Sequence, residues 1–86
     1  MKLAVCAVFD SAVQAYSRPI FVPKAAVAVR SFIDEVRRGG ADNSLSAHPE
    51  DYHLTHIADF DEDTGVFSTP DAGVSVLIRG KDAVAA

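Results

Sequence analysis

Cysteine is scarce in this chain of 86 residues, which contains one, and tryptophan is absent. A lone cysteine excludes an internal disulfide and any zinc site built from several cysteines. Cys6 lies within an apolar stretch, so we expect a buried structural thiol rather than a reactive one. Long apolar runs are also missing, since no stretch approaches the ~20 residues of a membrane span. Met1–Phe9 lacks the cleavage site of a signal peptide, so the expected compartment is a reducing cytoplasm.

Basic residues are also few, because 8 lysines and arginines face 12 acidic residues and leave a net charge of −4. Proteins that bind nucleic acid without specificity carry the opposite bias, since their cations replace the counterions on phosphates. Any role on DNA therefore requires a local basic patch, the surface of an oligomer, or an intermediary protein.

The chain is nevertheless too apolar to be disordered, because 49% of its residues are hydrophobic. Its length predicts a single domain with a thin stability margin, for which pairing with a second copy is a common remedy. We expect one α+β domain over residues 1–78 and a flexible tail at 79–86. The expected element order is ββαββ, a small antiparallel sheet with one helix packed on a face.

The first expected strand, Lys2–Phe9, is apolar on both faces. Alternate residues form the two faces, Leu3, Val5, Ala7 and Phe9 on one and Ala4, Cys6 and Val8 on the other. This pattern is typical of a central strand that is covered on two sides, or on one side by a partner chain. Together with the short chain, it predicts a homodimer. Asp10-Ser11 then begins a turn, and Tyr16–Val22 follows as an edge strand because Pro19 has no N–H.

A helix is predicted from Pro23, which suits a first helical position, to the Gly39-Gly40 pair that ends it. Its apolar stripe has helical spacing and consists of Ala25, Ala28, Val29, Phe32, Ile33 and Val36. Arg30 and Arg37 share another face, while Asp34 is four residues from both Arg30 and Arg38, which predicts ion pairs. The basic residues form either a solvated face or a ridge that binds phosphate or a partner.

The second half alternates between loops and strands. Its expected elements are a polar loop at Ala41–Ala47, a strand at Tyr52–Phe60, an acidic turn at Asp61–Gly65, a returning strand at Val66–Ser68, and a last strand at Val74–Ile78.

Candidate metal and catalytic motifs are weak. Asp59, Asp61 and Asp63 have the spacing of a calcium loop, but the glycine and the bidentate Glu of such a loop are misplaced, which favours a solvated acidic turn. His53 and His56 should point to opposite faces of their strand, and a carboxylate ligand would have to come from Asp59 or Glu50. No serine stands in a nucleophile motif, and no glycine-rich phosphate loop is present. We predict no catalytic residue, no metal site and no cofactor.

The segment His48-Pro49-Glu50-Asp51-Tyr52, called the HPEDY segment below, combines a turn fixed by proline, two acids and an aromatic residue. It either caps the start of the following strand, with Tyr52 packed on the helix, or recognises a partner. The candidate residues for binding nucleic acid or a partner are Arg18, Arg30, Arg37, His48, Glu50 and Tyr52. Arg18, and Arg79 with Lys81, would extend the basic ridge of the helix if the fold brings them together.

Several short motifs occur together in one order. They are Phe9-Asp10-Ser11, Ala15-Tyr16, Pro19 followed by Phe21, Ala28-x-Arg30-x-Phe32, the HPEDY segment, and Phe60-Asp61 ahead of Thr64-Gly65. The set resembles the small nonstructural protein of gokushoviruses, the single-stranded DNA phages of the family Microviridae. This resemblance covers roughly residues 1–67, and the segment from Pro70 onward matches no motif.

The resemblance implies a viral accessory protein without enzymatic activity, made in the cytoplasm of the infected bacterium. The family is likened to the microvirus protein C, which acts at the switch to single-stranded genome synthesis and packaging and is labelled DNA-binding. The expected function is therefore an accessory role in single-stranded DNA genome synthesis or packaging, with DNA binding. The expected partners are viral replication or capsid proteins, single-stranded DNA and a second copy, without a membrane. The alternative is a protein–protein interaction module that makes no contact with nucleic acid.

Overall fold

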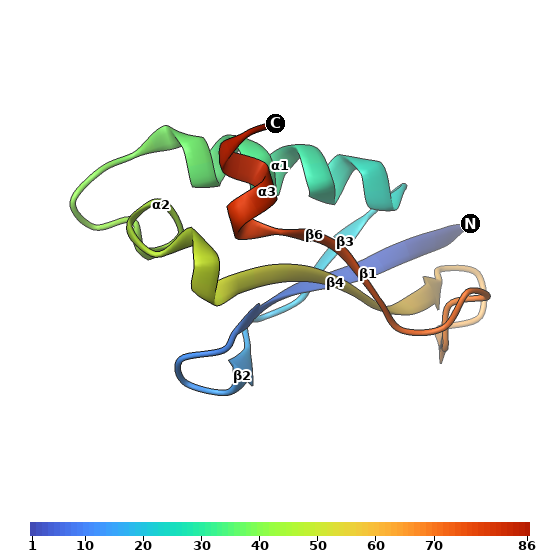
Figure 1. Cartoon of the computed structure of the whole chain (residues 1–86). Coiled ribbons are helices and arrows are strands. Elements are labelled where there is room, and N and C mark those ends of the chain that lie inside the picture. Colours follow the sequence, from blue (N-terminus) through green and yellow to red (C-terminus); the bar gives the residue numbers. More distant parts are fainter.

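Strand β1 (Lys2–Asp10) lies at the centre of the computed structural model, which describes residues 1–86. It pairs antiparallel with β4 (Tyr52–Asp61) along its whole length. The other edge of β1 pairs with β2 (Ala15–Tyr16) and β3 (Ile20–Val22). The outer edge of β4 pairs with β5 (Val66–Ser68) and β6 (Ser75–Arg79). The antiparallel sheet thus has two long central strands with two short strands on each edge (Figure 1).

Proline accounts for the broken edge beside β1. A single strand was predicted over Tyr16–Val22, but the structure divides it into β2 and β3, with Ser17, Arg18 and Pro19 between them. Because proline cannot donate to a ladder, the pairing with β1 stops before it and resumes at Ile20.

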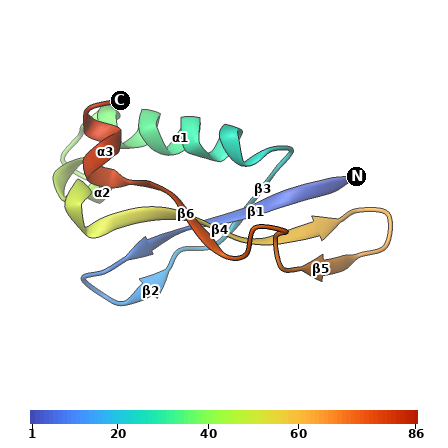
Figure 2. The ribbon, with the colours of Figure 1, turned by 45° about the vertical axis from the view of Figure 1, so that its right-hand side comes forward.

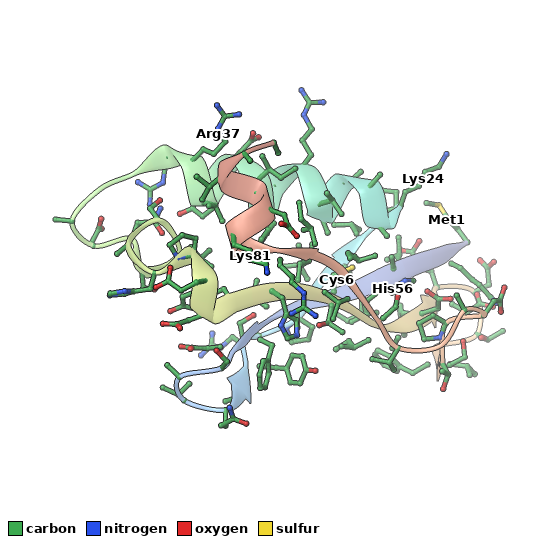
Figure 3. All side chains as sticks on the ribbon, in the orientation of Figure 1. Met1, Cys6, Lys24, Arg37, His56 and Lys81 are labelled. Carbon is green, nitrogen blue, oxygen red and sulfur yellow. The ribbon has the colours of Figure 1, made fainter.

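Helix α1 (Ala25–Arg38) lies across one face of the sheet (Figure 2). The predicted apolar stripe is confirmed, since every member is buried or half-buried. The predicted start at Pro23 is wrong by two residues, because Lys24 is the N-cap. Gly39 ends the helix with φ of 77°, a conformation that glycine adopts without strain. Lys24 and Arg37 point away from the sheet (Figure 3).

The core lies between α1 and the sheet. Its buried residues come from β1, β3, α1, β4 and the C-terminus: Ala4, Cys6, Val22, Ala28, Phe32, Val36, Leu54 and Ala83. Cys6 is fully buried, which confirms the predicted structural thiol. Burial, together with the nearby Asp59 carboxylate, raises the pKa of this thiol.

The predicted loop at Ala41–Ala47 is wrong in its second part, where α2 (Ser44–Ala47) forms. Asn43 is buried and caps this helix by accepting a hydrogen bond from the Ser46 N–H. The Asn43 amide also donates to the Glu35 carbonyl at 2.9 Å. These bonds tie α2 to the end of α1, so a tertiary contact rather than periodicity makes the turn helical.

The predicted tail at 79–86 is also wrong. Arg79 ends β6, and α3 (Gly80–Val84) follows and packs on α1 with Ala83 fully buried. The Arg37 guanidinium donates to the Ala86 carbonyl at 2.6 Å. The helix has only five residues, too few for a readable apolar period, and packing on α1 stabilises it.

The α+β class and the antiparallel sheet are therefore confirmed, whereas the ββαββ order with one helix is not. The observed order is β1, β2, β3, α1, α2, the 3₁₀ turn η1 (Pro49–Asp51), β4, β5, β6 and α3. None of the helices has the length and apolar composition needed to cross a membrane.

Candidate functional site

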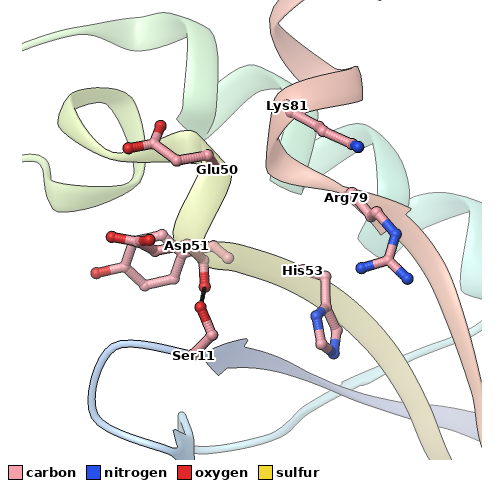
Figure 4. A pocket seen from close by; sticks show the side chains of 7 residues that line it. Ser11, Glu50, Asp51, His53, Arg79 and Lys81 are labelled. Carbon is pink, nitrogen blue, oxygen red and sulfur yellow. Dashed lines mark hydrogen bonds between the residues drawn. The ribbon is translucent and has the colours of Figure 1, made fainter.

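The HPEDY segment lies beside a polar hollow of about 280 Å³ at one end of the sheet (Figure 4). The hollow is lined by Ser11, Glu50, Asp51, Tyr52, His53, Arg79 and Lys81. These residues come from the turn after β1, from η1 with the start of β4, and from the junction of β6 and α3. Antiparallel register explains this meeting, because Tyr52 pairs with Asp10 and His53 pairs with Arg79.

Close backbone packing holds the hollow together. The backbone of Gly80 lies against Pro49, and a side chain at position 80 would overlap the Pro49 carbonyl oxygen. The Ser11 N–H and hydroxyl both donate to the Asp51 carbonyl at 2.9 Å. Tyr52 is half-buried and packs against the core cluster, whose members come from the sheet, α3 and the helix α1 on which it was predicted to pack. The segment thus joins η1, the turn after β1 and α3.

The charges in the hollow are divided between its two sides. Arg79 and Lys81 lie on one side and Glu50 on the other (Figure 4), and neither cation forms an ion pair. Burial lowers the pKa of His53, and the neighbouring Arg79 cation lowers it further. Its ring also stacks on Phe9, with centroids 5.1 Å apart.

A second polar surface is the outer face of α1, formed by Lys24, Arg30, Asp34 and Arg37, all exposed. The predicted ion pairs of Asp34 with Arg30 and Arg38 are wrong, because Arg38 pairs instead with Glu35 at 2.8 Å. Three cations of this face, Lys24, Arg30 and Arg37, pair with no acidic side chain, and Arg37 donates to the Ala86 oxygen.

The face of the sheet opposite α1, called the open sheet face below, is rich in rings: Phe9, Tyr16, Phe21, His53, Phe60 and Phe67. The rings form two groups, one with Phe9 between Tyr16 and His53, and the other with Phe21, Phe60 and Phe67 in mutual contact. No helix packs on this face (Figure 2). At its centre the Thr55 hydroxyl is buried and has no hydrogen-bond partner.

The structure does not gather the six predicted binding residues in one place. Arg30 and Arg37 lie on α1, Glu50 and Tyr52 line the hollow, and His48 and Arg18 lie in turns outside both surfaces. The prediction missed Ser11 and His53 as lining residues. Arg79 and Lys81 extend the HPEDY surface rather than the α1 ridge, because β6 pairs with the start of β4.

The histidines lie in separate surroundings. His53 pairs with Phe9 and His56 with Cys6, so they are on opposite faces, as predicted. A bulge in β4 brings His56 and Asp59 to the same face, where their side chains are 2.8 Å apart. The ligand atoms of His48, Glu50 and Asp51 lie within 4.8 Å of one another in one turn, an arrangement that does not by itself define a metal site.

The acidic turn is a hairpin, as the sequence predicted. It joins β4 to β5, and Gly65 has φ of 74°. The terminal ammonium of Met1 pairs with Asp63 at 2.7 Å, which lowers the pKa of this exposed carboxyl and raises that of the ammonium. Asp61 and Glu62 form no ion pair.

A helix-covered antiparallel sheet with one open face thus characterises the fold, and comparison with known proteins identifies its family. The chain belongs to the family of phage ORF5 proteins, whose family model matches residues 3–83. Protein ORF5 of Chlamydia phage 1, a gokushovirus of the Microviridae, is 31% identical over 81 residues. The match covers 92% of this chain and 84% of that relative. No solved structure matches the chain.

These matches confirm the resemblance to a small gokushovirus protein and establish a viral, bacteriophage protein. They also correct its extent. The family match continues to residue 83, so β6 and α3, in which no motif was recognised, belong to the shared chain.

Proposed function

We propose that this protein is a nonstructural accessory protein without enzymatic activity, which acts in the synthesis or packaging of a phage's single-stranded DNA genome. Its family and its gokushovirus relative support the viral setting. The host-cell cytoplasm is the compartment that this role requires. The hollow supports a binding rather than a catalytic role, because Ser11 donates its hydroxyl to a backbone carbonyl instead of to a base.

We place the contact with single-stranded DNA on the outer face of α1. The segment 24–38 holds four basic and two acidic residues, whereas the whole chain has a net charge of −4. It is thus the local basic patch that an acidic DNA-binding protein needs. The single observation that carries this assignment is the exposure of Lys24, Arg30 and Arg37, none of which pairs with an acidic side chain, although Arg37 donates to the Ala86 oxygen.

The geometry of α1 suits phosphate groups. Arg30 and Arg37 are seven residues apart, a rise of about 10 Å along one side of a helix. The Arg30 guanidinium can contact a phosphate through paired hydrogen bonds, and Arg37 can contact one with the N–H groups that it does not donate to Ala86. Asp34 lies between them and weakens the local field, so the predicted binding is modest and independent of base sequence.

The test is fluorescence anisotropy of a labelled single-stranded oligonucleotide at several salt concentrations. The double variant Arg30→Ala/Arg37→Ala should bind more weakly and reduce the slope of log affinity against log salt by about 1.4, because each phosphate contact contributes about 0.7. Arg38→Ala is the matched control, since Glu35 already neutralises that cation. A wild-type protein that binds no oligonucleotide at low salt would remove the DNA contact from the proposal.

The second candidate function is a protein–protein interaction module without nucleic-acid contact. The open sheet face favours it, because apolar rings of this kind commonly mark protein interfaces. A pull-down from infected cells separates the two functions. The interaction module would be favoured if replication or capsid proteins are still recovered after nuclease treatment. Their recovery should then be equal for the wild type and for Arg30→Ala/Arg37→Ala.

A further inference from the structure

The open sheet face is apolar over most of its extent and lacks a cover. Val5 and Ala7 at its centre are only 2% exposed, because larger side chains close over them. Those larger side chains are themselves open to solvent, with Tyr16, Phe21 and Phe67 exposed by 52%, 46% and 57%. Burying large aromatic side chains contributes strongly to association, so this face is suited to a second layer.

We propose that a second copy of the chain covers the open sheet face, which yields a symmetric dimer. The two sheets would stack face to face, with the α1 helices on the two outer surfaces. Stacked sheets of this kind lie about 10 Å apart and interdigitate their inner side chains. A two-fold axis makes the contact self-complementary, since the same patch serves both copies.

The size of the face agrees with this occupant. The molecule extends 41 Å by 23 Å in its two longest directions, which sets an upper limit of about 900 Å² on the face. A stable interface of standard size needs about 800 Å² from each partner. A dimer of standard size would therefore use nearly the whole face, and not one group of rings alone.

The charges at the two ends of the face are complementary to those of a second copy. The acidic turn with Asp61 and Glu62 lies at one end, and Arg79 and Lys81 lie at the other, where Glu50 and Asp51 also line the hollow. A two-fold axis perpendicular to the strands, in the plane between the two sheets, places the acidic turn of each copy over the end of its partner that carries Arg79 and Lys81. An axis parallel to the strands would instead stack the two acidic turns. The exposed, unpaired cations Arg79 and Lys81 thus favour the perpendicular axis, which brings them to the acidic turn of the second copy.

Single-stranded DNA fits the open sheet face less well. Proteins that stack bases on aromatic side chains also supply a positively charged groove for the backbone. Here the cations of the hollow lie at one end, and the acidic turn repels phosphate from the other. The dimer leaves the outer face of α1 free, so it is compatible with DNA bound there.

The mass of the full chain in solution tests the dimer. Light scattering at micromolar concentrations should give twice the 9.1 kDa of one chain. Phe67→Asp and Phe21→Asp each place a carboxylate within the face and should raise the dimer dissociation constant at least about tenfold. Val27→Asp is the matched control, because Val27 is 46% exposed but lies on α1. A wild-type monomer, or a dimer lost equally in all three variants, overturns the proposal.

A charge exchange tests the orientation without disturbing the rings. Glu62→Arg and Arg79→Glu should each weaken the dimer, and the double variant should recover most of the wild-type affinity. Circular dichroism confirms folding of each variant. Additive weakening in the double variant refutes the arrangement. A monomer whose oligonucleotide binding is abolished by Phe67→Asp would identify DNA as the occupant and refute the second copy.

Discussion

Substitution of Gly80 by alanine tests the junction that holds the polar hollow. Gly80 is the first residue of α3, and its φ lies outside the left-handed region, so the backbone conformation does not require glycine. The added methyl group would overlap the Pro49 carbonyl oxygen and lie 2.8 Å from the carbonyl carbon and 3.1 Å from Cα. These are backbone atoms, so α3 and η1 would have to separate.

Two effects of this substitution oppose each other. Alanine favours a helix over glycine by about 1 kcal/mol in a helix interior, whereas overpacking typically costs about 1–3 kcal/mol. Gly80 is at the helix end, where the propensity gain is smaller, and its neighbour is rigid. We therefore expect a net loss of about 2 kcal/mol, which lowers Tm by roughly 8–16 °C for a chain of this size.

Urea unfolding followed by circular dichroism measures this loss. Lys81→Ala is the control, because this exposed neighbour in α3 should change stability by less than about 0.5 kcal/mol. A Gly80→Ala variant as stable as the wild type, or more stable, would show that α3 does not pack closely on Pro49. The assigned role of the HPEDY segment as a junction would then be wrong.

Three further predictions concern single side chains. Asn43→Ala should cost about 1–2 kcal/mol in urea unfolding, because it removes the α2 cap and one of the two hydrogen bonds, from Asn43 and from Ser46, that the Glu35 carbonyl accepts. The pKa of His53 is lower in the folded protein than its ordinary value of 6.5, so the unfolded chain binds the proton more readily. The free energy of unfolding should therefore fall as the pH decreases through about 6.5. Urea midpoints at two pH values should show this in wild type and in His48→Gln, and less in His53→Gln. Cys6 is fully buried and its pKa is raised, so a thiol reagent should react only as fast as the protein opens, and immediate stoichiometric labelling would contradict this burial.

The sequence predicted those elements whose side chains repeat with a clear period. The stripe from Ala25 to Val36 has helical spacing, and β1 alternates between two apolar faces, so both were identified correctly. The acidic hairpin followed from its turn residues. By contrast, α2 and α3 have four and five residues, too few to show a period, and they form through contacts with distant parts of the chain.

The polar hollow could be predicted only in part. The residue types of the HPEDY segment indicated a candidate site. The position of Arg79 and Lys81 beside it depends on the register between β4 and β6, which contains a bulge. Strand register is set by tertiary pairing and not by the local pattern. Asp34 illustrates the same limit on α1, where Glu35 rather than Asp34 pairs with Arg38.

Sedimentation of the full chain with a fluorescent single-stranded oligonucleotide at low salt tests the central claim most directly, because it reports assembly and DNA binding together. The account predicts that the oligonucleotide sediments with a dimer, since the open sheet face joins two copies and leaves the outer face of α1 free. Phe67→Asp should give a monomer that still binds the oligonucleotide, more weakly because one chain offers a single α1. A protein that sediments as a 9.1 kDa monomer while the oligonucleotide remains free would contradict both parts of the account.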